Sequence, residues 1–268
     1  MEKHNKMIFE KISELVKEGK KFVLATIIEA SAGSPGRTGF KMILTNDGKT
    51  YGTLGGGELE YQSTKEMKEV MKQKKSKTLK YSLTPDLKMA CGGKVTLFLE
   101  YFDSIKTAWL FGGGHLAVDL TPVLALLGFR VNVIDNRKEY AEKSRFLNVN
   151  EVINNDYLEF AETFNPSNDD SIVVFTHGHT FDYDILNILC KRNLNVKYLG
   201  VIGAENKIRK IRKKIINFNY EGNLIDRVYG PIGLNIATKT TSEIAVSIAA
   251  EILAVYNGVE EIKFMSKK

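Results

Sequence analysis

Apolar residues recur along the first hundred positions with two different periods. Residues 7–18 place Ile8, Ile12 and Leu15 at helical spacing and are followed by Gly19, which predicts an amphipathic helix. Shorter apolar runs, with a hairpin signal at Asn46-Asp47-Gly48, predict strands. These strands are expected at residues 22–28, 41–45, 50–54, 77–82 and 94–101, with a second helix from residue 58 to about residue 71. The pattern indicates a small mixed sheet with helices.

The stretch from Thr107 to Arg137 has a different organisation. An apolar strand at residues 108–111 enters Gly112-Gly113-Gly114, a helical apolar pattern follows until Gly128, and a second strand at 131–134 ends on Asp135. Gly112, Gly114 and Ala117 fit the spacing G-x-G-x-x-A of a dinucleotide-binding turn, and Asp135 follows at about 20 residues. This order predicts a Rossmann-type unit with a ribose contact at Asp135, although such a turn can also serve only to pack a helix on a strand.

Helices and strands continue to alternate after Asp135. We expect strands at residues 172–175 and 196–202 and helices at 183–190, 205–216 and 244–256. The predicted fold class is α/β, with a C-terminal Rossmann-like parallel sheet covered by helices on both faces and a smaller mixed α/β domain before it. The expected domains are residues 1–104 and 105–268.

Composition narrows the class of protein. Hydrophobic residues make up 43% of the chain and charged residues 26%, values typical of a globular protein. The net charge of +6 is scattered, and the basic helix at residues 207–214 lacks interleaved aromatics, so no nucleic-acid partner is expected. Two cysteines give no disulfide framework and fit a reducing cytoplasm. The charged N-terminus and the short apolar run near residues 244–255 predict neither a signal peptide nor a membrane span.

Several polar groups of the first domain could bind an anion. Gly55, Gly56 and Gly57 precede a helix, where successive backbone N–H groups can converge on a negative ligand. Ser34, Arg37 and Lys41 lie in and beside a second glycine-rich loop, at residues 31–39, and could add donors. On spacing alone, a close-packed turn and ordinary surface residues explain the same pattern equally well.

The two cysteines have different surroundings in the sequence. Cys91 adjoins Gly92-Gly93 between two strands, where a thiol can be partly exposed near backbone donors that lower its pKa. A buried structural thiol is the alternative. Cys190 lies on the apolar face of the helix predicted at residues 183–190 and is expected to be a core residue.

Histidines follow the strand predicted at residues 172–175. His177 and His179, with Asp182 nearby, have a spacing that zinc can use, but only two other histidines, His4 and His115, exist elsewhere. We therefore predict no metal site. Because ligands bind at the carboxyl ends of parallel strands, His177 and His115 are expected to face one crevice, to which Gly203 and Lys207 would also belong.

Taken together, the ordered motifs resemble the xanthine dehydrogenase accessory factor family, XdhC/CoxI, over nearly the whole chain. The first domain supplies Ser34-Pro35-Gly36-Arg37, the run from Gly55 to Glu60 and Cys91-Gly92-Gly93, and the second supplies LFGGGHLA at residues 110–117, VIDNR at 133–137 and FTHGHTFD at 175–182. The motifs YLGVIGA at 198–204, PIGLNI at 231–236 and SEIAVSIAAEI at 242–252 complete the set. The chain departs from the family pattern at Ala204-Glu205, where a serine and a basic residue are common.

The resemblance implies a maturation factor rather than a turnover enzyme. Such proteins bind the molybdenum cofactor, a molybdopterin that is in some forms a dinucleotide, support its sulfuration with a cysteine desulfurase, and deliver it to an apo-molybdenum hydroxylase. A homodimer is also expected, because the final helix is apolar. The implied cofactor-binding residues are Ser34, Arg37, Lys41, Gly55, Gly56, Gly57, Cys91, Gly92, Gly93, Gly112, Gly113, Gly114, His115, Asp135, His177 and Gly203.

A different class of function fits part of the same pattern. An NAD(P)-dependent oxidoreductase would use the glycine turn at residues 112–114 and Asp135, and the following Asn136-Arg137 leaves the choice between NAD and NADP open. The sequence lacks an evident hydride-transfer pair for that reaction, such as Tyr-x-x-x-Lys after a serine. The resemblance instead favours a contact between the Cys91 thiol and the metal or the labile sulfur of the molybdenum cofactor.

Overall fold

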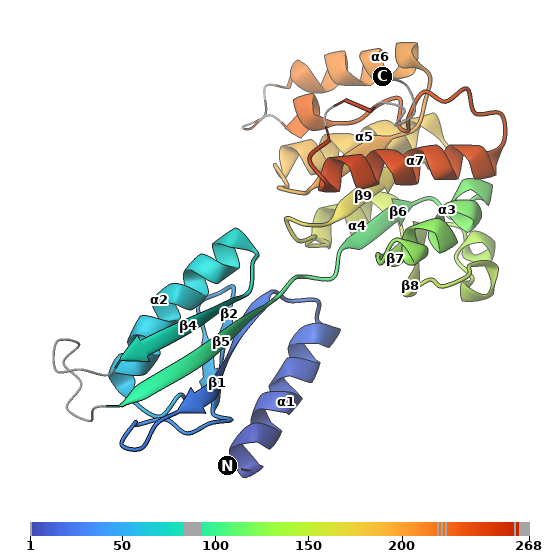
Figure 1. Cartoon of the computed structure of the whole chain (residues 1–268). Helices are drawn as coiled ribbons and strands as arrows, with labels where there is room; N and C mark the ends of the chain where they lie inside the picture. The colour runs from blue at the N-terminus through green and yellow to red at the C-terminus, as the bar shows by residue number, and fades with distance from the viewer. Residues whose placement is uncertain are drawn as a thin grey trace, which may run out of the picture. The chain divides into compact units, whose positions relative to one another are not determined.

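The computed structural model describes residues 2–82, 93–218, 220, 222, 224–259 and 261–262. The chain divides into two compact units, Met1–Ile105 and Lys106–Lys268. Figure 1 shows them as a blue-to-green unit and a green-to-red unit. Among the described residues, no helix has both the length and the apolar character that crossing a bilayer requires.

The first unit is an antiparallel sheet covered by one helix on each face. Its strands are β1 (Phe22–Ala30), β2 (Lys41–Thr45), β3 (Thr50–Gly52), β4 (Lys77–Ser82) and β5 (Lys94–Phe102), in the order β3-β2-β1-β5-β4. The helices α1 (Glu2–Lys17) and α2 (Gly57–Gln73) pack against opposite faces. Side chains of β1 alternate accordingly, since Phe22 and Leu24 join the cluster with α1 while Val23 and Ala25 join the cluster with α2.

The second unit is a five-stranded parallel sheet. Its strands are β6 (Thr107–Phe111), β7 (Arg130–Asp135), β8 (Glu151–Asn154), β9 (Ser171–Val174) and β10 (Tyr198–Val201), in the order β10-β9-β6-β7-β8. Its α-helices are α3 (His115–Leu126), α4 (Tyr157–Thr163), α5 (His179–Lys191), α6 (Glu205–Ile216) and α7 (Thr241–Tyr256). The chain runs outward from β6 to β8 and then returns to β9, so the strand order reverses between β6 and β9.

Two apolar clusters hold helices on the two faces of this sheet. Leu120 of α3 and Ile248 of α7 belong to the cluster that includes Leu110 and Val133. Side chains from α4, α5 and α6 belong to the other, with Phe111 of β6. The predicted α/β class, with a Rossmann-like parallel sheet between helices and a mixed unit before it, is therefore confirmed.

Several sequence-derived boundaries need correction. Strand β8 and helix α4 were not predicted, because each is short and carries no clear period. Helix α5 begins at His179 instead of residue 183, so Asp182 lies in its first turn rather than in a loop. The strand expected at residues 50–54 ends at Gly52.

The α-helices of the second unit differ in how their first turns are capped. Helix α4 starts after Asp156, whose carboxylate accepts from two backbone N–H groups, and α7 starts with a capping box between Thr240 and Glu243. Helices α3, α5 and α6 have no side-chain cap. Their first N–H groups are thus left for water or a ligand.

We expect Thr240→Ala to lower the free energy of unfolding by about 1 kcal/mol, because the capping hydrogen bond to the Glu243 N–H is lost. Urea denaturation followed by circular dichroism measures the change. Thr238→Ala, two residues earlier and with no hydrogen bond recorded for its side chain among the described residues, is the control and should leave the midpoint unchanged. Equal midpoints for both variants would contradict the capping role.

Candidate functional site

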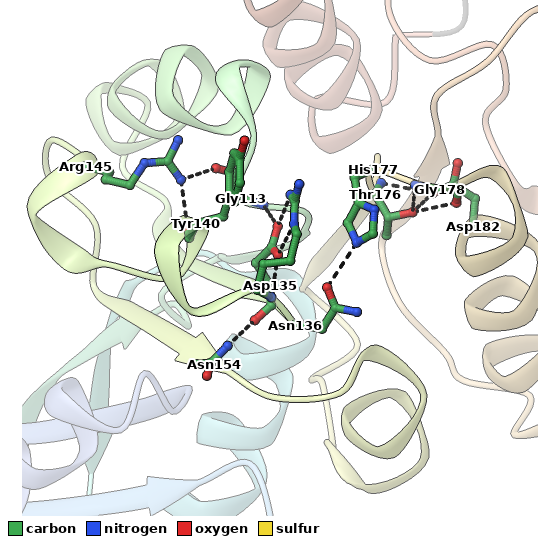
Figure 2. Close-up of polar contacts among 11 residues, drawn as sticks. Gly113, Asp135, Asn136, Tyr140, Arg145, Asn154, Thr176, His177, Gly178 and Asp182 are labelled. Carbon is green, nitrogen blue, oxygen red and sulfur yellow. Dashed lines mark hydrogen bonds and ion pairs between the residues drawn. The ribbon is translucent and has the colours of Figure 1, made fainter.

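The predicted site residues of the second unit lie at the ends of its strands or directly after them. Figure 2 shows Gly113 from the turn after β6, Asp135 and Asn136 from the end of β7, and the Thr176–Gly178 turn after β9. These turns flank the point at which the strand order reverses. In open parallel sheets that point is where ligands bind.

The first two glycines of the turn after β6 are required by close packing. Gly112 has φ +126°, and a Cβ there would lie 2.5 Å from the backbone oxygen of Phe175. A Cβ on Gly113 would lie 2.4 Å from the backbone oxygen of Tyr140. Gly114 differs, because no atom lies within 4 Å of its Cβ position. The turn is therefore closely packed at Gly112 and Gly113 and open at Gly114, which is the N-cap of α3.

The start of α3 suits an anion. Gly114 is its N-cap, no side chain caps the first turn, and that turn contains no acidic residue. The positive end of the helix dipole and the first backbone N–H groups thus face the open space at Gly114. His115, the first helical residue, is exposed.

Asp135 is tied to the protein itself. Its side chain is fully buried, and its carboxylate accepts from the Gly113 N–H at 2.7 Å and from Arg137 Nε and Nη2 at 3.0 and 2.9 Å. Burial alone would raise the pKa of Asp135, but the hydrogen bonds from Arg137 and Gly113 outweigh it and lower that pKa. The ribose contact stays a prediction, since both carboxylate oxygens already have protein donors.

Two arginines surround Tyr140 in the loop after β7, a feature not predicted as part of the site. The guanidinium carbon of Arg137 lies 3.6 Å from the centroid of the Tyr140 ring, and that of Arg145 lies 4.7 Å from it. Arg145 Nη1 also donates to the Gly113 and Tyr140 carbonyls at 2.7 and 2.9 Å (Figure 2). The only sequence signal for this cluster is the basic residue two positions after Asp135.

His177 links two loops rather than contacting the glycine turn. Its Nε2 lies 3.1 Å from Oδ1 of Asn136 (Figure 2). Its ring packs against Phe181 and Tyr157, with ring centroids 5.2 and 6.2 Å away. Because β6 lies between β7 and β9, this contact crosses the carboxyl end of β6. No contact between His177 and His115 is recorded among the described residues, so their shared crevice stays a prediction.

Lys207 and Asp182 form a buried ion pair at the ends of β9 and β10. Lys207 Nζ lies 2.6 Å from Asp182 Oδ2 and donates to the Ile202 carbonyl, while Asp182 Oδ1 accepts from the Thr176 hydroxyl at 2.6 Å. The stem of Lys207 covers Gly203, whose Cβ position lies 2.6 Å from Lys207 Cδ. The ammonium group of Lys207 is therefore paired with Asp182, and the lack of a side chain at Gly203 leaves space for the Lys207 stem.

The glycine loops of the first unit pack directly on each other. A Cβ on Gly36 would lie 2.3 Å from the Leu54 carbonyl oxygen, and one on Gly55 would lie 2.4 Å from that of Pro35. Gly93 closes the group, since its Cβ position lies 2.9 Å from the Ser31 hydroxyl. The structure thus brings together three loops that lie far apart in the sequence.

The predicted donors around these loops have different surroundings. Ser34 Oγ lies 2.8 and 2.9 Å from the carbonyls of Ser31 and Gly36, so its hydroxyl holds its own loop. Lys41 Nζ lies 3.2 Å from Thr26 Oγ1. Arg37 is exposed, and no hydrogen bond or ion pair is recorded for its side chain among the described residues.

The turn at Gly55–Gly57 is less suited to an anion than the turn after β6. The Gly55 N–H donates to Thr53 Oγ1, and the first turn of α2 carries two carboxylates. Glu60 accepts from the Leu54 N–H and the Thr53 hydroxyl, and Glu58 accepts from Gln62. No side chain caps the start of α2 at Gly56, and the space at the Cβ position of Gly57 is open.

Cys91 and Gly92 lie outside the described residues, so their predicted role stays a prediction. Cys190 is buried, and burial raises the pKa of its thiol to about 12. Within the described part of the chain, no group of three or more His, Cys, Asp or Glu side chains could hold a metal ion.

A cavity lies elsewhere in the second unit. Its volume is about 710 Å³, and its lining includes Leu199, Val228 and Glu251, at the edge formed by β10 and the end of α7. None of the predicted site residues lines it.

Fold and strand-end turns together define a Rossmann-type protein in which α3 starts without a side-chain cap, preceded by a glycine-loop unit. Comparison with protein-family models identifies the family to which this Rossmann-type protein belongs. Residues 108–252 match the model of the XdhC Rossmann domain, and residues 15–82 match that of the XdhC and CoxI family. The chain belongs to the XdhC family, which confirms the resemblance found from its motifs.

Individual relatives agree with this assignment. The chain is 26% identical over 255 residues to the uncharacterized protein YqeB of Escherichia coli, covering 93% of the chain and 46% of that protein. It is 31% identical over 157 residues to a probable xanthine dehydrogenase subunit of Bacillus subtilis, covering 59% of the chain and 45% of that protein. The chain thus spans about half the length of these curated relatives.

A solved structure shares the fold. A crystal structure described as a xanthine dehydrogenase from Bacillus halodurans superposes with a TM-score of 0.52 at 21% identity. The match covers 96% of this chain and 97% of that one. At this level of identity the likeness concerns the fold alone.

The different packing of the glycines predicts a contrast in stability. Gly112→Ala should lower the free energy of unfolding by at least about 1 kcal/mol, because alanine is strained at positive φ and its Cβ would meet the Phe175 carbonyl. Gly114→Ala should be nearly neutral, since Gly114 has φ −71° and open space around it. Urea denaturation of the two variants measures the contrast, and equal losses would contradict this account of the turn.

Proposed function

We propose that the chain is an accessory factor for a xanthine dehydrogenase-type molybdenum hydroxylase. In this proposal it binds the molybdenum cofactor, supports its sulfuration and delivers it to the apoenzyme. The observation that carries the proposal is membership of the XdhC family, with family models matched in both units. The name of the Bacillus subtilis relative, which is that of a probable xanthine dehydrogenase component, supports the choice of client.

The residues of the first unit fit the chemistry of such a cofactor. A molybdopterin carries a phosphate, which needs positive charge and hydrogen-bond donors. Because Glu58 and Glu60 place negative charge in the first turn of α2, the positive charge must come from elsewhere. Arg37, exposed and with no recorded side-chain partner among the described residues, can supply it, and the open space at Gly57 leaves room for a ligand.

Each residue of this unit then has a separate task. The packed glycines Gly36 and Gly55 fix the loops, Arg37 binds the phosphate, and Lys41 adds charge from the start of β2. Cys91 would contact the metal or its labile sulfur, because a soft thiolate suits both. When bound, the cofactor supplies the molybdenum chemistry that the client hydroxylase later uses.

The proposal includes two kinds of partner and one assembly. An apo-molybdenum hydroxylase would receive the cofactor, and a cysteine desulfurase would provide the sulfur. A homodimer would be the assembled form. A pull-down with each purified partner and a measurement of the mass in solution test these three statements separately.

The function is tested with molybdenum cofactor released from a purified molybdenum hydroxylase. The protein should retain molybdenum and pterin fluorescence through gel filtration and should restore activity to an apo-xanthine dehydrogenase. Retention without transfer would reject delivery, and absence of both would reject the proposal. Oxidation of NADH or NADPH by the purified protein, followed by absorbance, would instead favour the oxidoreductase alternative.

Arg37→Ala should weaken cofactor retention about tenfold or more, because hydrogen bonds to charged groups contribute roughly 1.5–3 kcal/mol. Lys68→Ala is the matched control, because it also removes one exposed positive charge from the first unit, on α2. It should retain the cofactor as the unmodified protein does. Similar retention by all three proteins would remove Arg37 from the site.

Cys91→Ser should fold normally but lose most of the transfer to the apo-hydroxylase, because a hard hydroxyl oxygen does not replace a soft thiolate. Cys190→Ser is the internal control. It should lower stability, since a hydroxyl group enters the apolar cluster around Cys190, without changing transfer per folded molecule. Undiminished transfer by Cys91→Ser would make Cys91 a structural residue.

A further inference from the structure

The turn after β7 offers a ligand positive charge, although its sequence predicted an acidic contact. The carboxylate of Asp135 is fully buried, whereas 27% of the Arg137 side chain is exposed beside it. In a Rossmann fold the ribose of a bound adenosine lies at this strand end. A ribose placed here would therefore meet the guanidinium of Arg137 before it could meet the carboxylate.

Arg137 is held rigidly in that position. Its Nε and Nη2 form a two-point contact with Asp135, and its guanidinium lies 3.6 Å from the Tyr140 ring centroid. Its Nη1 has no hydrogen bond recorded among the described residues. A planar guanidinium fixed in this way loses little conformational freedom when it binds a phosphate.

Arg145 makes the net charge of the cluster positive. The charges of Arg137 and Asp135 compensate each other, but the hydrogen bonds recorded for Arg145 go to the carbonyls of Gly113 and Tyr140 and not to a carboxylate. The neighbouring Glu139 and Glu142 make no ion pair with either arginine in the described part of the chain. One uncompensated positive charge therefore remains beside the glycine turn.

The start of α3 provides the second half of a nucleotide site. It is uncapped, has no acidic residue in its first turn and faces open space at Gly114, as a pyrophosphate requires. The cluster is joined to this turn, because Asp135 accepts from the Gly113 N–H and Arg145 donates to the Gly113 carbonyl. The two parts are thus held in a fixed relation within one unit.

We infer that the second unit binds an adenine dinucleotide that carries a 2′-phosphate on its adenosine ribose, with Arg137 binding that phosphate and Asp135 holding Arg137 in place. The ligand class is NADP rather than NAD. A free ribose diol would need the Asp135 carboxylate, whose oxygens are already occupied by Gly113 and Arg137. This inference goes beyond cofactor delivery and does not rest on it.

Calorimetric titration of the full chain with NADP⁺ and NAD⁺ tests the inference directly. NADP⁺ should bind at least about tenfold more tightly, which corresponds to about 1.4 kcal/mol. Adenosine 2′,5′-bisphosphate should likewise bind more tightly than 5′-AMP. In both comparisons, the difference in affinity should become smaller as the salt concentration is raised. Equal affinities, tighter NAD⁺ or no binding of either dinucleotide would overturn the inference. Competition by inorganic phosphate as strong as that by adenosine 2′,5′-bisphosphate would reduce the site to an anion site and also overturn it.

Variants separate the role of Arg137 from that of Asp135. Removing Arg137 alone would leave a buried carboxylate unpaired, so Arg137→Gln is combined with Asp135→Asn, which keeps a neutral pair in the same space. The double variant should lose the preference for NADP⁺. Arg209→Ala, an exposed arginine of α6 whose recorded hydrogen bond goes only to Asn206, should keep it.

Asp135→Asn alone distinguishes the two assignments of the acid. If the carboxylate bound the ribose, this variant would lose affinity for NAD⁺ and NADP⁺ alike. If it positions Arg137, the affinity for NAD⁺ stays nearly unchanged and the preference for NADP⁺ falls, because the amide nitrogen of asparagine cannot accept the second hydrogen bond from the guanidinium. A drop in affinity for NAD⁺ in this variant, or persistence of the preference for NADP⁺ in the double variant, would contradict the assignment.

Discussion

The geometry of the second unit depends on one buried carboxylate. Asp135 ends β7, yet its oxygens bind the Gly113 N–H in the turn after β6 and the guanidinium of Arg137 in the next loop. A buried ion without these partners would be strongly destabilising, so the position of each partner is effectively fixed. The hydrogen bond to Asp135 fixes the backbone of Gly113, directly before the open N-cap position at Gly114.

A similar arrangement shapes the first unit. Glu60 of α2 accepts from the Leu54 N–H and the Thr53 hydroxyl, and so holds the turn that leads from β3 into the helix. Gly55 in that turn then packs against the Pro35 carbonyl. In both units an acidic residue near a glycine turn has a protein partner, which leaves basic residues to meet a negative ligand.

The sequence predicted the fold well and the site only in part. Regular apolar periods and glycine turns located most elements, and the run from β6 to Asp135 identified the Rossmann unit. The apolar periodicity did not reveal β8 and α4, because four and seven residues are too few to show a repeating pattern. The motif located Asp135 but not its partners, because hydrogen bonds to Gly113 and Arg137 depend on how the turn folds and not on spacing. Tyr140 and Arg145 belong to an irregular loop, so nothing periodic marked them.

Helix capping explains why the start of α3 keeps free backbone donors while the starts of α4 and α7 do not. Asp156 and the Thr240–Glu243 pair satisfy the first N–H groups of α4 and α7 internally, and both caps have residue types that a sequence reveals. A glycine N-cap such as Gly114 offers no such partner, so a helix there keeps unsatisfied donors at its positive end. The fold tolerates this because α3 is secured by its apolar packing against the sheet and α7. Because Gly114 has no side chain to cap α3, the first backbone N–H groups of that helix stay available for a ligand.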